Sequence, residues 1–221
     1  MKPVKEMRCG GFYDAIWYLK NRTLIEFDNA LGAFAGVGGF RLRQLMESFD
    51  NVVAMDIRQD YLSSITKSGS IYCKCCDSIE YLNSSFPSIN FDFIHLDNPF
   101  GLFGPDSKYC EHFDCLIPAV KHLTNLGPIL TYVISSPYEH DEPRNAGWID
   151  RHRKFYGECY ESMTVENLTK VYQRIIEEEL KKSTSVRSTQ VTVKAFPRYS
   201  KDCGDSLTDY YFLILVGDCE K

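Results

Sequence analysis

A glycine-rich run, Gly32-Ala-Phe-Ala-Gly-Val-Gly-Gly-Phe40, constrains this chain more than any other stretch. The segment before it, at 24–31, has the length and apolar character of a strand, and apolar residues recur at helical spacing across 40–49. In a strand–turn–helix unit, glycines let the backbone turn tightly and approach a ligand, while the helix start presents unpaired N–H groups. The run therefore predicts a site for a nucleotide-like ligand. A glycine turn that binds nothing is the alternative.

An acid follows the glycine run at a distance typical of nucleotide binding. The apolar run Val52-Val-Ala-Met-Asp56 ends in this acid, twenty residues after Gly36. At this spacing a carboxylate reaches the two hydroxyls of an adenosine ribose. We therefore expect Asp56, with its neighbour Ile57, to border a bound adenosine.

The string Phe34 to Leu42, Phe-Ala-Gly-Val-Gly-Gly-Phe-Arg-Leu, resembles the cofactor motif of DNA cytosine-C5 methyltransferases, which belong to the class I methyltransferases that use S-adenosylmethionine (SAM). This resemblance implies SAM as the cofactor. It also implies a three-layer, Rossmann-like α/β fold, with a mostly parallel seven-stranded sheet and an antiparallel C-terminal strand pair. The cofactor-binding residues that it implies are Phe34, Ala35, Gly36, Gly38, Gly39, Phe40, Asp56, Ile57, Asp77, Ser78 and Asp97.

The chain departs from the family motif at one position, and two further candidate contacts have alternatives. The family usually has an acid two residues before the first Phe of the motif, where this chain has Gly32; the nearest upstream acid is Asp28. Asp77 follows the expected strand 70–75, where this fold touches the adenine amino group, but Asp is also a favoured helix N-cap, and the two roles are compatible. Phe12 and Tyr13, in an expected N-terminal helix, are candidates either for cofactor contact or for helix packing alone.

A second informative stretch, 91–101, begins as a buried parallel strand and ends in Asp97-Asn98-Pro99-Phe100-Gly101. Its end is expected at the carboxyl edge of the sheet, where open α/β sheets bind ligands. The lone pair of an exocyclic base amine is delocalised into the ring. Acceptors on Asp97 or Asn98 would hold the amine N–H groups and direct that lone pair at a methyl donor. Pro99 fixes the turn, and Phe100 offers a face for base stacking.

Asp97-Asn98-Pro99-Phe100 resembles the (Asp/Asn/Ser)-Pro-Pro-(Phe/Tyr) motif of amino-group DNA and RNA methyltransferases, with Asn98 in place of a proline. With its neighbours Leu96 and Gly101 it also resembles the Leu-Asp-Pro-Phe-Gly motif of tRNA guanine-N2 methyltransferases. On the cytosine-C5 motif Pro-Cys-Gln-x-Phe, Phe100 would occupy the position of the nucleophilic cysteine. Phenylalanine cannot add to C6 of cytosine, so the residues argue against C5 chemistry by the usual route. A turn after a core strand is the structural alternative.

Composition is that of an ordinary globular protein. The 221 residues, 44% hydrophobic and 25% charged, suit a single α/β domain spanning 1–221, and no apolar run has the length of a membrane span. Nine cysteines, an odd number, favour reduced thiols and therefore an intracellular, cytoplasmic location. The spacing Cys110-x-His112-x-x-Cys115 would suit a metal pair, but buried thiols are the better explanation, and we expect no metal site.

Two further regions concern the substrate. The polar, aromatic and basic stretch 136–162 is long for a connection and predicts a substrate lid, with surface decoration as the alternative. Residues 181–201 carry six basic residues and no acid, although the net charge is −5. Such a stretch suits phosphate contact or, equally, a solvated strand edge. Residues 1–22 are expected to form an N-terminal helical extension, with an apolar stripe of Phe12, Ile16, Trp17 and Leu19, followed by a first strand at about 24–34. Further helices are expected over 111–124 and over 164–183, the second capped at Thr164.

The sequence therefore favours a SAM-dependent methyltransferase acting on an exocyclic base amine in RNA, in a tRNA-like molecule, or in DNA. The expected catalytic residues are Asp97, Asn98, Pro99 and Phe100. Two alternatives stay open: a methyltransferase for a small molecule or protein, and a non-catalytic SAM-binding subunit, suggested by Gly32 and the irregular motif at 97–100. The chain has little room for a separate target-recognition region, which makes a partner subunit one way to recognise substrate.

Overall fold

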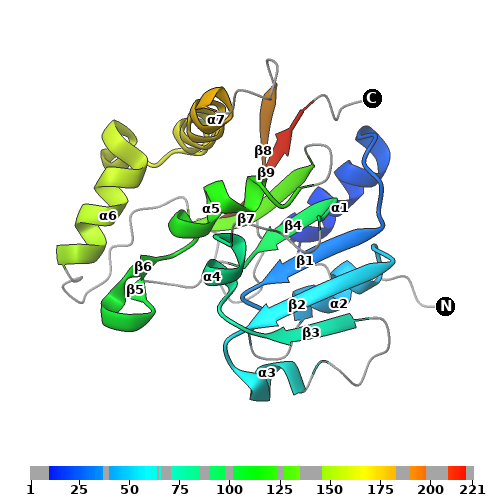
Figure 1. Ribbon diagram of the computed structural model, residues 1–221. Coiled ribbons are helices and arrows are strands. Elements are labelled where there is room, and N and C mark those ends of the chain that lie inside the picture. The colour runs from blue at the N-terminus through cyan, green and yellow to red at the C-terminus, as the bar shows by residue number, and fades with distance from the viewer. Residues whose placement is uncertain are drawn as a thin grey trace.

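The computed structural model describes residues 10–36, 40–63, 65, 71–84, 90–97, 102–123, 127–134, 146–182, 190–197 and 209–217. A seven-stranded sheet runs through these residues in the order β3-β2-β1-β4-β7-β9-β8 (Figure 1). Its strands are β1 Asn29–Ala33, β2 Asn51–Asp56, β3 Ile71–Cys75, β4 Phe93–Leu96, β7 Pro128–Ile134, β8 Val191–Pro197 and β9 Asp209–Val216. β9 pairs antiparallel with β7 and β8, and the other pairs are parallel. The predicted mostly parallel sheet with a closing antiparallel pair is confirmed.

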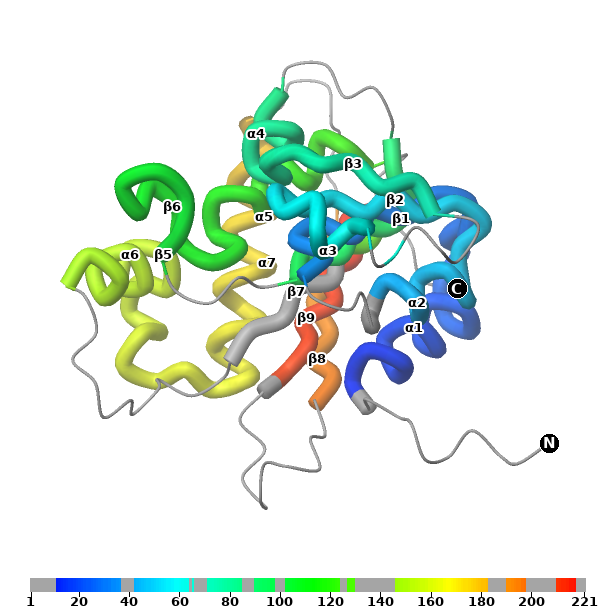
Figure 2. The backbone as a smooth tube through the Cα atoms, turned by 90° about the horizontal axis from the view of Figure 1, so that it is seen from below, coloured from blue at the N-terminus to red at the C-terminus, as the bar shows by residue number. Residues whose placement is uncertain are grey.

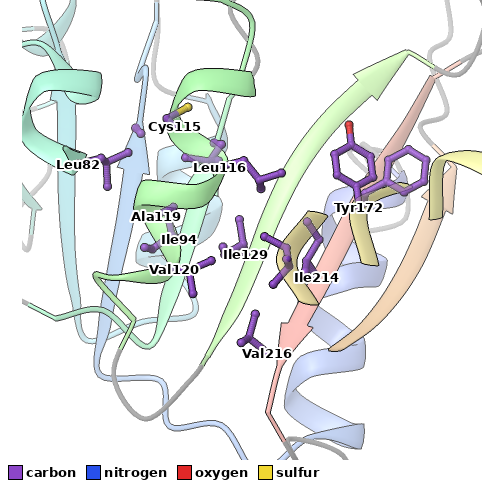
Figure 3. Packing of buried hydrophobic residues seen from close by; sticks show 14 of the residues in the cluster. Leu82, Ile94, Cys115, Leu116, Ala119, Val120, Ile129, Tyr172, Ile214 and Val216 are labelled. Atoms are coloured by element: carbon purple, nitrogen blue, oxygen red, sulfur yellow. The ribbon is translucent and has the colours of Figure 1, made fainter. Parts of the chain in front are cut away.

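Helices pack against both faces of the sheet, giving three layers (Figures 1 and 2). One face is covered by α1 Gly10–Arg22, α2 Phe40–Met46 and α3 Gln59–Ser63. The other is covered by α4 Ser78–Leu82, α5 Phe113–Val120 and α7 Val165–Lys182, and α6 Ala146–Tyr156 packs against α5, where the rings of Phe155 and Phe113 stack. Figure 3 shows part of this second core, where Leu116 and Ala119 of α5 lie between the sheet residue Ile129 and α4. None of the described helices is long and apolar enough to span a bilayer.

The strands in the middle of the sheet are apolar on both faces because both faces are covered. In β2, Val53 and Met55 join the core under α4 and α5, whereas Val52 and Ala54 join the core under α1 and α2. This explains why the sequence shows continuous apolar runs there and not an alternation of apolar and polar residues. Burying each such side chain contributes roughly 1.5–3 kcal/mol.

Several expected boundaries differ from the structure. The strand predicted over 24–34 is the shorter β1, which begins at Asn29 and ends at Ala33. The helix predicted over 111–124 is the shorter α5, Phe113–Val120. The stripe predicted for the first helix buries Phe12, Ile16 and Leu19, but Trp17 is 58% exposed because it points away from the sheet. The cap at Thr164 is confirmed: its Oγ1 accepts a hydrogen bond from the Asn167 N–H at 3.2 Å.

The predicted lid is mostly helical where the structure describes it. Residues 146–161 form α6 and a 3₁₀ turn, η4 Gly157–Glu161. Trp148, His152 and Tyr156 of α6 are buried, so this part of the stretch packs onto the rest of the domain. Its role as a substrate lid stays a prediction.

Candidate functional site

The carboxyl ends of β1, β2 and β4 meet at one edge of the sheet. Ala33, the last residue of β1, is in register with Met55 of β2 on one side and with Leu96 of β4 on the other. β2 itself ends at Asp56, and the segments that follow β1 and β4 begin at Phe34 and Asp97. Tertiary structure therefore brings together three of the segments that the sequence singled out.

The glycine turn leaves β1 through an unusual backbone conformation. Phe34 and Gly36 have φ values of 58° and 64°, in the left-handed region. Glycine adopts this region without cost, whereas for phenylalanine it costs energy that the surrounding structure must offset. The Ala35 N–H donates to the Met55 carbonyl at 2.9 Å and so ties the turn to β2. Gly38 and Gly39 lie outside the described residues, and Phe40 begins α2.

Asp56 organises the two loops beside it. The carboxylate is 8% exposed; its Oδ2 accepts a hydrogen bond from the Gly36 N–H at 2.9 Å, and its Oδ1 accepts one from the Arg58 N–H at 2.8 Å. Each carboxylate oxygen can accept a second hydrogen bond. The next residue, Ile57, is 70% exposed, which is unusual for so large an apolar side chain and leaves a flat apolar surface beside the carboxylate.

The end of β3 supplies the third loop. Asp77 is the N-cap of α4, since its Oδ1 accepts hydrogen bonds from the N–H groups of Ile79 at 2.8 Å and Glu80 at 3.3 Å. The capping alternative for this residue is therefore confirmed. Both bonds use one oxygen, so the cap is compatible with a second role for the other. Ser78 is buried, and its Oγ lies 3.5 Å from the Phe34 nitrogen, which links this loop to the glycine turn.

Gly32 is where the chain departs from the family motif, and packing explains the glycine. A Cβ added there would lie 2.2 Å from Cδ2 of Leu42 on α2. A side chain at this position would displace this Leu42 methyl, so the glycine fits the packing of α2 on β1. Asp28, the nearest upstream acid, precedes β1 and so lies at its amino end, away from the glycine turn.

Asp97 lies directly after β4 and beside the glycine turn. Its N–H donates to the carbonyl of Ala33 at 3.3 Å, and its side chain is half-buried. Asn98, Pro99 and Phe100, the other expected catalytic residues, lie outside the described residues. The structure therefore places one member of the motif at the edge of the sheet where a substrate would meet the glycine turn.

The sequence interpretation missed a small hairpin just after this motif. β5 Leu102–Phe103 and β6 Tyr109–Cys110 pair antiparallel around the 3₁₀ turn η3 Pro105–Ser107. The ring of Phe103 packs edge-on against Phe34 at 5.9 Å and also contacts Tyr109 at 5.8 Å. Gly104-Pro105-Asp106-Ser107 is a strong turn signal that would have located the hairpin.

A buried polar cluster follows the hairpin and holds α6. Oε1 of Glu111, which is 7% exposed, accepts a hydrogen bond from Nε1 of Trp148 at 3.2 Å and lies 2.8 Å from Nε2 of His152. One carboxylate between the hairpin and α5 therefore fixes two residues of α6. Glu111 adopts a positive φ of 49°, which is consistent with its sitting in a tight turn before α5.

Next to Glu111, His112 is completely buried, and Nε2 of its ring lies 2.9 Å from the hydroxyl of Tyr172 on α7. Burial lowers the pKa of His112 from 6.5 to about 4, so the ring is neutral near pH 7. Burial also raises the pKa of the Cys115 thiol, which donates to the His112 carbonyl at 3.2 Å. These contacts account for the Cys-His-Cys spacing as packing; within the described residues no cluster of three or more His, Cys, Asp or Glu side chains is arranged to hold a metal.

Two other candidates lie away from this edge. Phe12 has no exposed surface and packs edge-on against His95 and Tyr211, which favours the helix-packing alternative. A groove of about 470 Å³ runs between α1 and the end of α2. It is lined by Tyr13, Asp14, Ile16, Trp17, Lys20, Glu47 and Ser48. None of the predicted site residues at 34–40, 56–57, 77–78 or 97 borders it.

Comparison with known proteins connects this architecture to methyltransferases. No protein-family model matches the sequence, and no curated protein is significantly similar to it. Among solved structures, an S-adenosylmethionine-dependent methyltransferase from Clostridium acetobutylicum is 15% identical with a TM-score of 0.53, over 93% of this chain and 91% of that one. An rRNA methylase from Streptococcus thermophilus is 7% identical with a TM-score of 0.51, over 94% and 97%.

A further neighbour is SMU.776, whose crystal structure is a complex with SAH; it is 12% identical with a TM-score of 0.51 over 91% of this chain. The chain spans about half the length of this neighbour, 48%, and of a similar protein from Streptococcus mutans, 47%. At these identities the likeness establishes architecture. The chain has the α/β, Rossmann-like fold found in SAM-dependent methyltransferases.

Proposed function

We propose that this chain is a SAM-dependent methyltransferase that modifies an exocyclic amino group of a base in nucleic acid. The observation that carries the proposal is the position of Asp97. Its backbone is hydrogen-bonded to Ala33, the last residue before the glycine turn, so its side chain starts beside the segment proposed to bind the cofactor. Fold likeness to SAM-dependent enzymes, among them an rRNA methylase, supports the proposal.

The residues at the sheet edge fit a nucleoside cofactor. Asp56 keeps acceptor capacity on both oxygens for ribose hydroxyls, Ile57 offers an exposed apolar surface for a base, and Gly36 allows the backbone to approach. The Gly38, Gly39 and Phe40 positions complete the proposed loop, with Asp77 and Ser78 on its far side. The anchor for the methionine amino group differs from the family pattern, because this chain has Gly32 where the family has an acid, and the Leu42 side chain packs against that position.

When bound, SAM would supply an electrophilic methyl group. The chain itself would hold the target amine. A side-chain oxygen of Asp97 or Asn98 would accept hydrogen bonds from the N–H groups of the target amine. These hydrogen bonds would direct the nitrogen lone pair toward the methyl carbon. In this proposal Pro99 would set the turn, and Phe100 would stack on the base. The amine proton is lost after transfer, with Asp97 as the nearest proposed acceptor.

The test is methyl transfer from labelled SAM to bulk tRNA, rRNA and DNA, measured for the native sequence and for Asp97→Ala. Turnover should fall by at least about 100-fold, the scale of losing one well-placed polar group at a reacting centre. SAM affinity, measured by calorimetry, should change far less. Asp28→Ala is a matched control, because this exposed acid precedes β1 at the opposite edge of the sheet.

The outcomes separate the candidate functions. Unchanged transfer in Asp97→Ala would make Asp97 a turn residue only. Transfer to a small molecule or protein but to no nucleic acid would favour the second candidate. SAM binding with no transfer to any acceptor would favour a non-catalytic subunit, and addition of a partner subunit would then be the next comparison. Cytosine-C5 methylation by Phe100→Cys would identify a degenerate C5 enzyme.

A further inference from the structure

The β5–β6 hairpin and α6 together form a wall beyond the carboxyl edge of the sheet. Figure 1 shows them on the side toward which the arrowheads of β1 and β2 point. We call residues 102–110 and 146–156 the hairpin–α6 wall. A series of contacts links it to the glycine turn: Phe34 packs on Phe103, and Phe103 packs on Tyr109. A substrate that reached Asp97 would therefore meet this wall.

Two cations are held together on the wall. Nη1 of Arg151 on α6 donates to the backbone carbonyl of Lys108 in the hairpin. Nζ of Lys108 lies over the Tyr109 ring, 5.0 Å from its centroid. The guanidinium has five N–H donors in a rigid fork, so a single bond to the carbonyl positions it and leaves others for a ligand. The Lys108 side chain is exposed, and that of Arg151 is half-buried.

Neither cation forms an ion pair with a carboxylate among the described residues. The closest acids in the wall's own sequence are Asp106 and Asp150, both exposed. Arg153, two residues further along α6, behaves differently: its guanidinium lies 3.9 Å from the Glu161 carboxylate and over the ring of Tyr160. Arg153 therefore has anionic and aromatic partners within the protein, and Lys108 and Arg151 keep capacity for an anion from outside.

The buried cluster behind the wall keeps this arrangement rigid. Glu111 immediately follows β6, and its carboxylate binds Trp148 and His152, which precede and follow Arg151 on α6. Phe113 and Phe155 add a stacked ring pair at 4.0 Å between α5 and α6. Because its helix is fixed on both sides, Arg151 loses little conformational entropy when it binds a ligand, which favours affinity.

We propose that the hairpin–α6 wall binds the phosphate backbone of the nucleic-acid substrate, with Lys108 and Arg151 contacting adjacent phosphates. This rests on the proposed function and adds the residues that hold the strand next to the target base. Nucleic acid is favoured over an acidic protein because Lys108 lies over the ring of Tyr109, which packs on Phe103, and Phe103 packs on Phe34 of the glycine turn. Arginine and aromatic side chains together suit phosphates and bases.

The test measures binding of single-stranded RNA by fluorescence anisotropy across salt concentrations. Lys108→Gln with Arg151→Gln should lower the slope of log K against log salt by about 1 to 2, as expected for the loss of two phosphate contacts. The matched control is Lys20→Gln with Arg43→Gln, which removes the same charge from exposed positions on α1 and α2, across the sheet. The single variant Lys108→Gln, at an exposed side chain, serves as a fold-neutral check on the double variant.

An equal slope change in the control pair would show a diffuse charge effect and overturn the proposal. The proposal would also be overturned if Lys108→Gln and the double variant kept the native slope of log K against log salt while retaining the native melting temperature. Failure of the proposed function gives a different result: the native sequence would then transfer no methyl group to any nucleic acid. If the native sequence methylates RNA and the wall variants match it in binding and transfer, this inference alone is wrong.

Discussion

The backbone N–H of Gly36 donates a 2.9 Å hydrogen bond to Oδ2 of Asp56, joining two loops that are twenty residues apart. The other oxygen of the same carboxylate binds the Arg58 N–H. In this structure Asp56 therefore shapes the glycine turn directly, in addition to any contact with a ligand. The distal acid of this sequence motif therefore has a structural role, beside the recognition role that we propose for it.

Replacing this carboxylate should affect both the fold and cofactor binding. Asp56→Ala would leave the Gly36 and Arg58 N–H groups without their acceptors, and we expect a loss of about 1–3 kcal/mol in the free energy of unfolding. SAM affinity should weaken by about 1–3 kcal/mol more through the lost charge-assisted hydrogen bonds. Urea unfolding and calorimetry measure the two effects. Asp60→Ala, which removes an exposed partner of Arg58, should change neither, and equal effects of the two variants would contradict a specific role for Asp56.

Gly32 should be intolerant of any side chain. Since a Cβ at this position would lie 2.2 Å from Leu42 Cδ2, Gly32→Ala should lower the free energy of unfolding by about 1–3 kcal/mol through overpacking. Adding Leu42→Ala should recover part of this loss, because it removes the clashing atoms. A double-mutant cycle by urea unfolding measures the coupling. If the effects of Gly32→Ala and Leu42→Ala on the free energy of unfolding were strictly additive, the contact between position 32 and Leu42 would not account for the loss.

The buried His112 should make stability depend on pH. Its pKa is lowered to about 4 in the fold, so between about pH 6.5 and pH 4 the unfolded chain binds the proton that the folded chain excludes. The free energy of unfolding should therefore fall as the pH drops through this window. His112→Gln should reduce this pH dependence by up to the uptake of one proton per molecule on unfolding. The measurement is the free energy of unfolding of the variant and of the native protein, each determined at pH 7.5 and at pH 4.5. Nearby Glu111, His152 and Tyr172 are retained in both proteins, so an identical slope would refute the assignment.

Loss of the Glu111 carboxylate should release α6. Glu111→Ala would leave Nε1 of Trp148 and Nε2 of His152 buried without this acceptor, at a cost of about 1–3 kcal/mol. Trp148 fluorescence, recorded in a Trp17→Phe background, should shift to longer wavelength as the indole meets water. Glu158→Ala, at an exposed position just after α6, is the control. An unshifted spectrum would show that aromatic packing alone holds the helix.

The sequence by itself determined which segments form the central strands and where the glycine turn follows them, whereas the mostly parallel seven-stranded sheet was expected from the resemblance to class I methyltransferases. Long apolar runs required strands covered on both faces, the glycine run required a tight strand-to-helix turn, and Asp56 and Asp97 were placed at strand ends by the same periodicity. These features are local or depend on chain order, so they can be inferred without knowing distances between segments.

Tertiary structure alone decided how these parts meet. The register between β1 and β4 sets the hydrogen bond between Asp97 and Ala33. The packing of Leu42 of α2 against β1 gives a reason for glycine at position 32. The sequence marks the turn of the β5–β6 hairpin, but the two-residue pairing of its strands is too short to leave a periodic signal. Glu111 gained its partners from α6, nearly 40 residues later in the chain. Contacts between distant segments depend on packing geometry in three dimensions, which residue types and spacing along the chain do not encode locally.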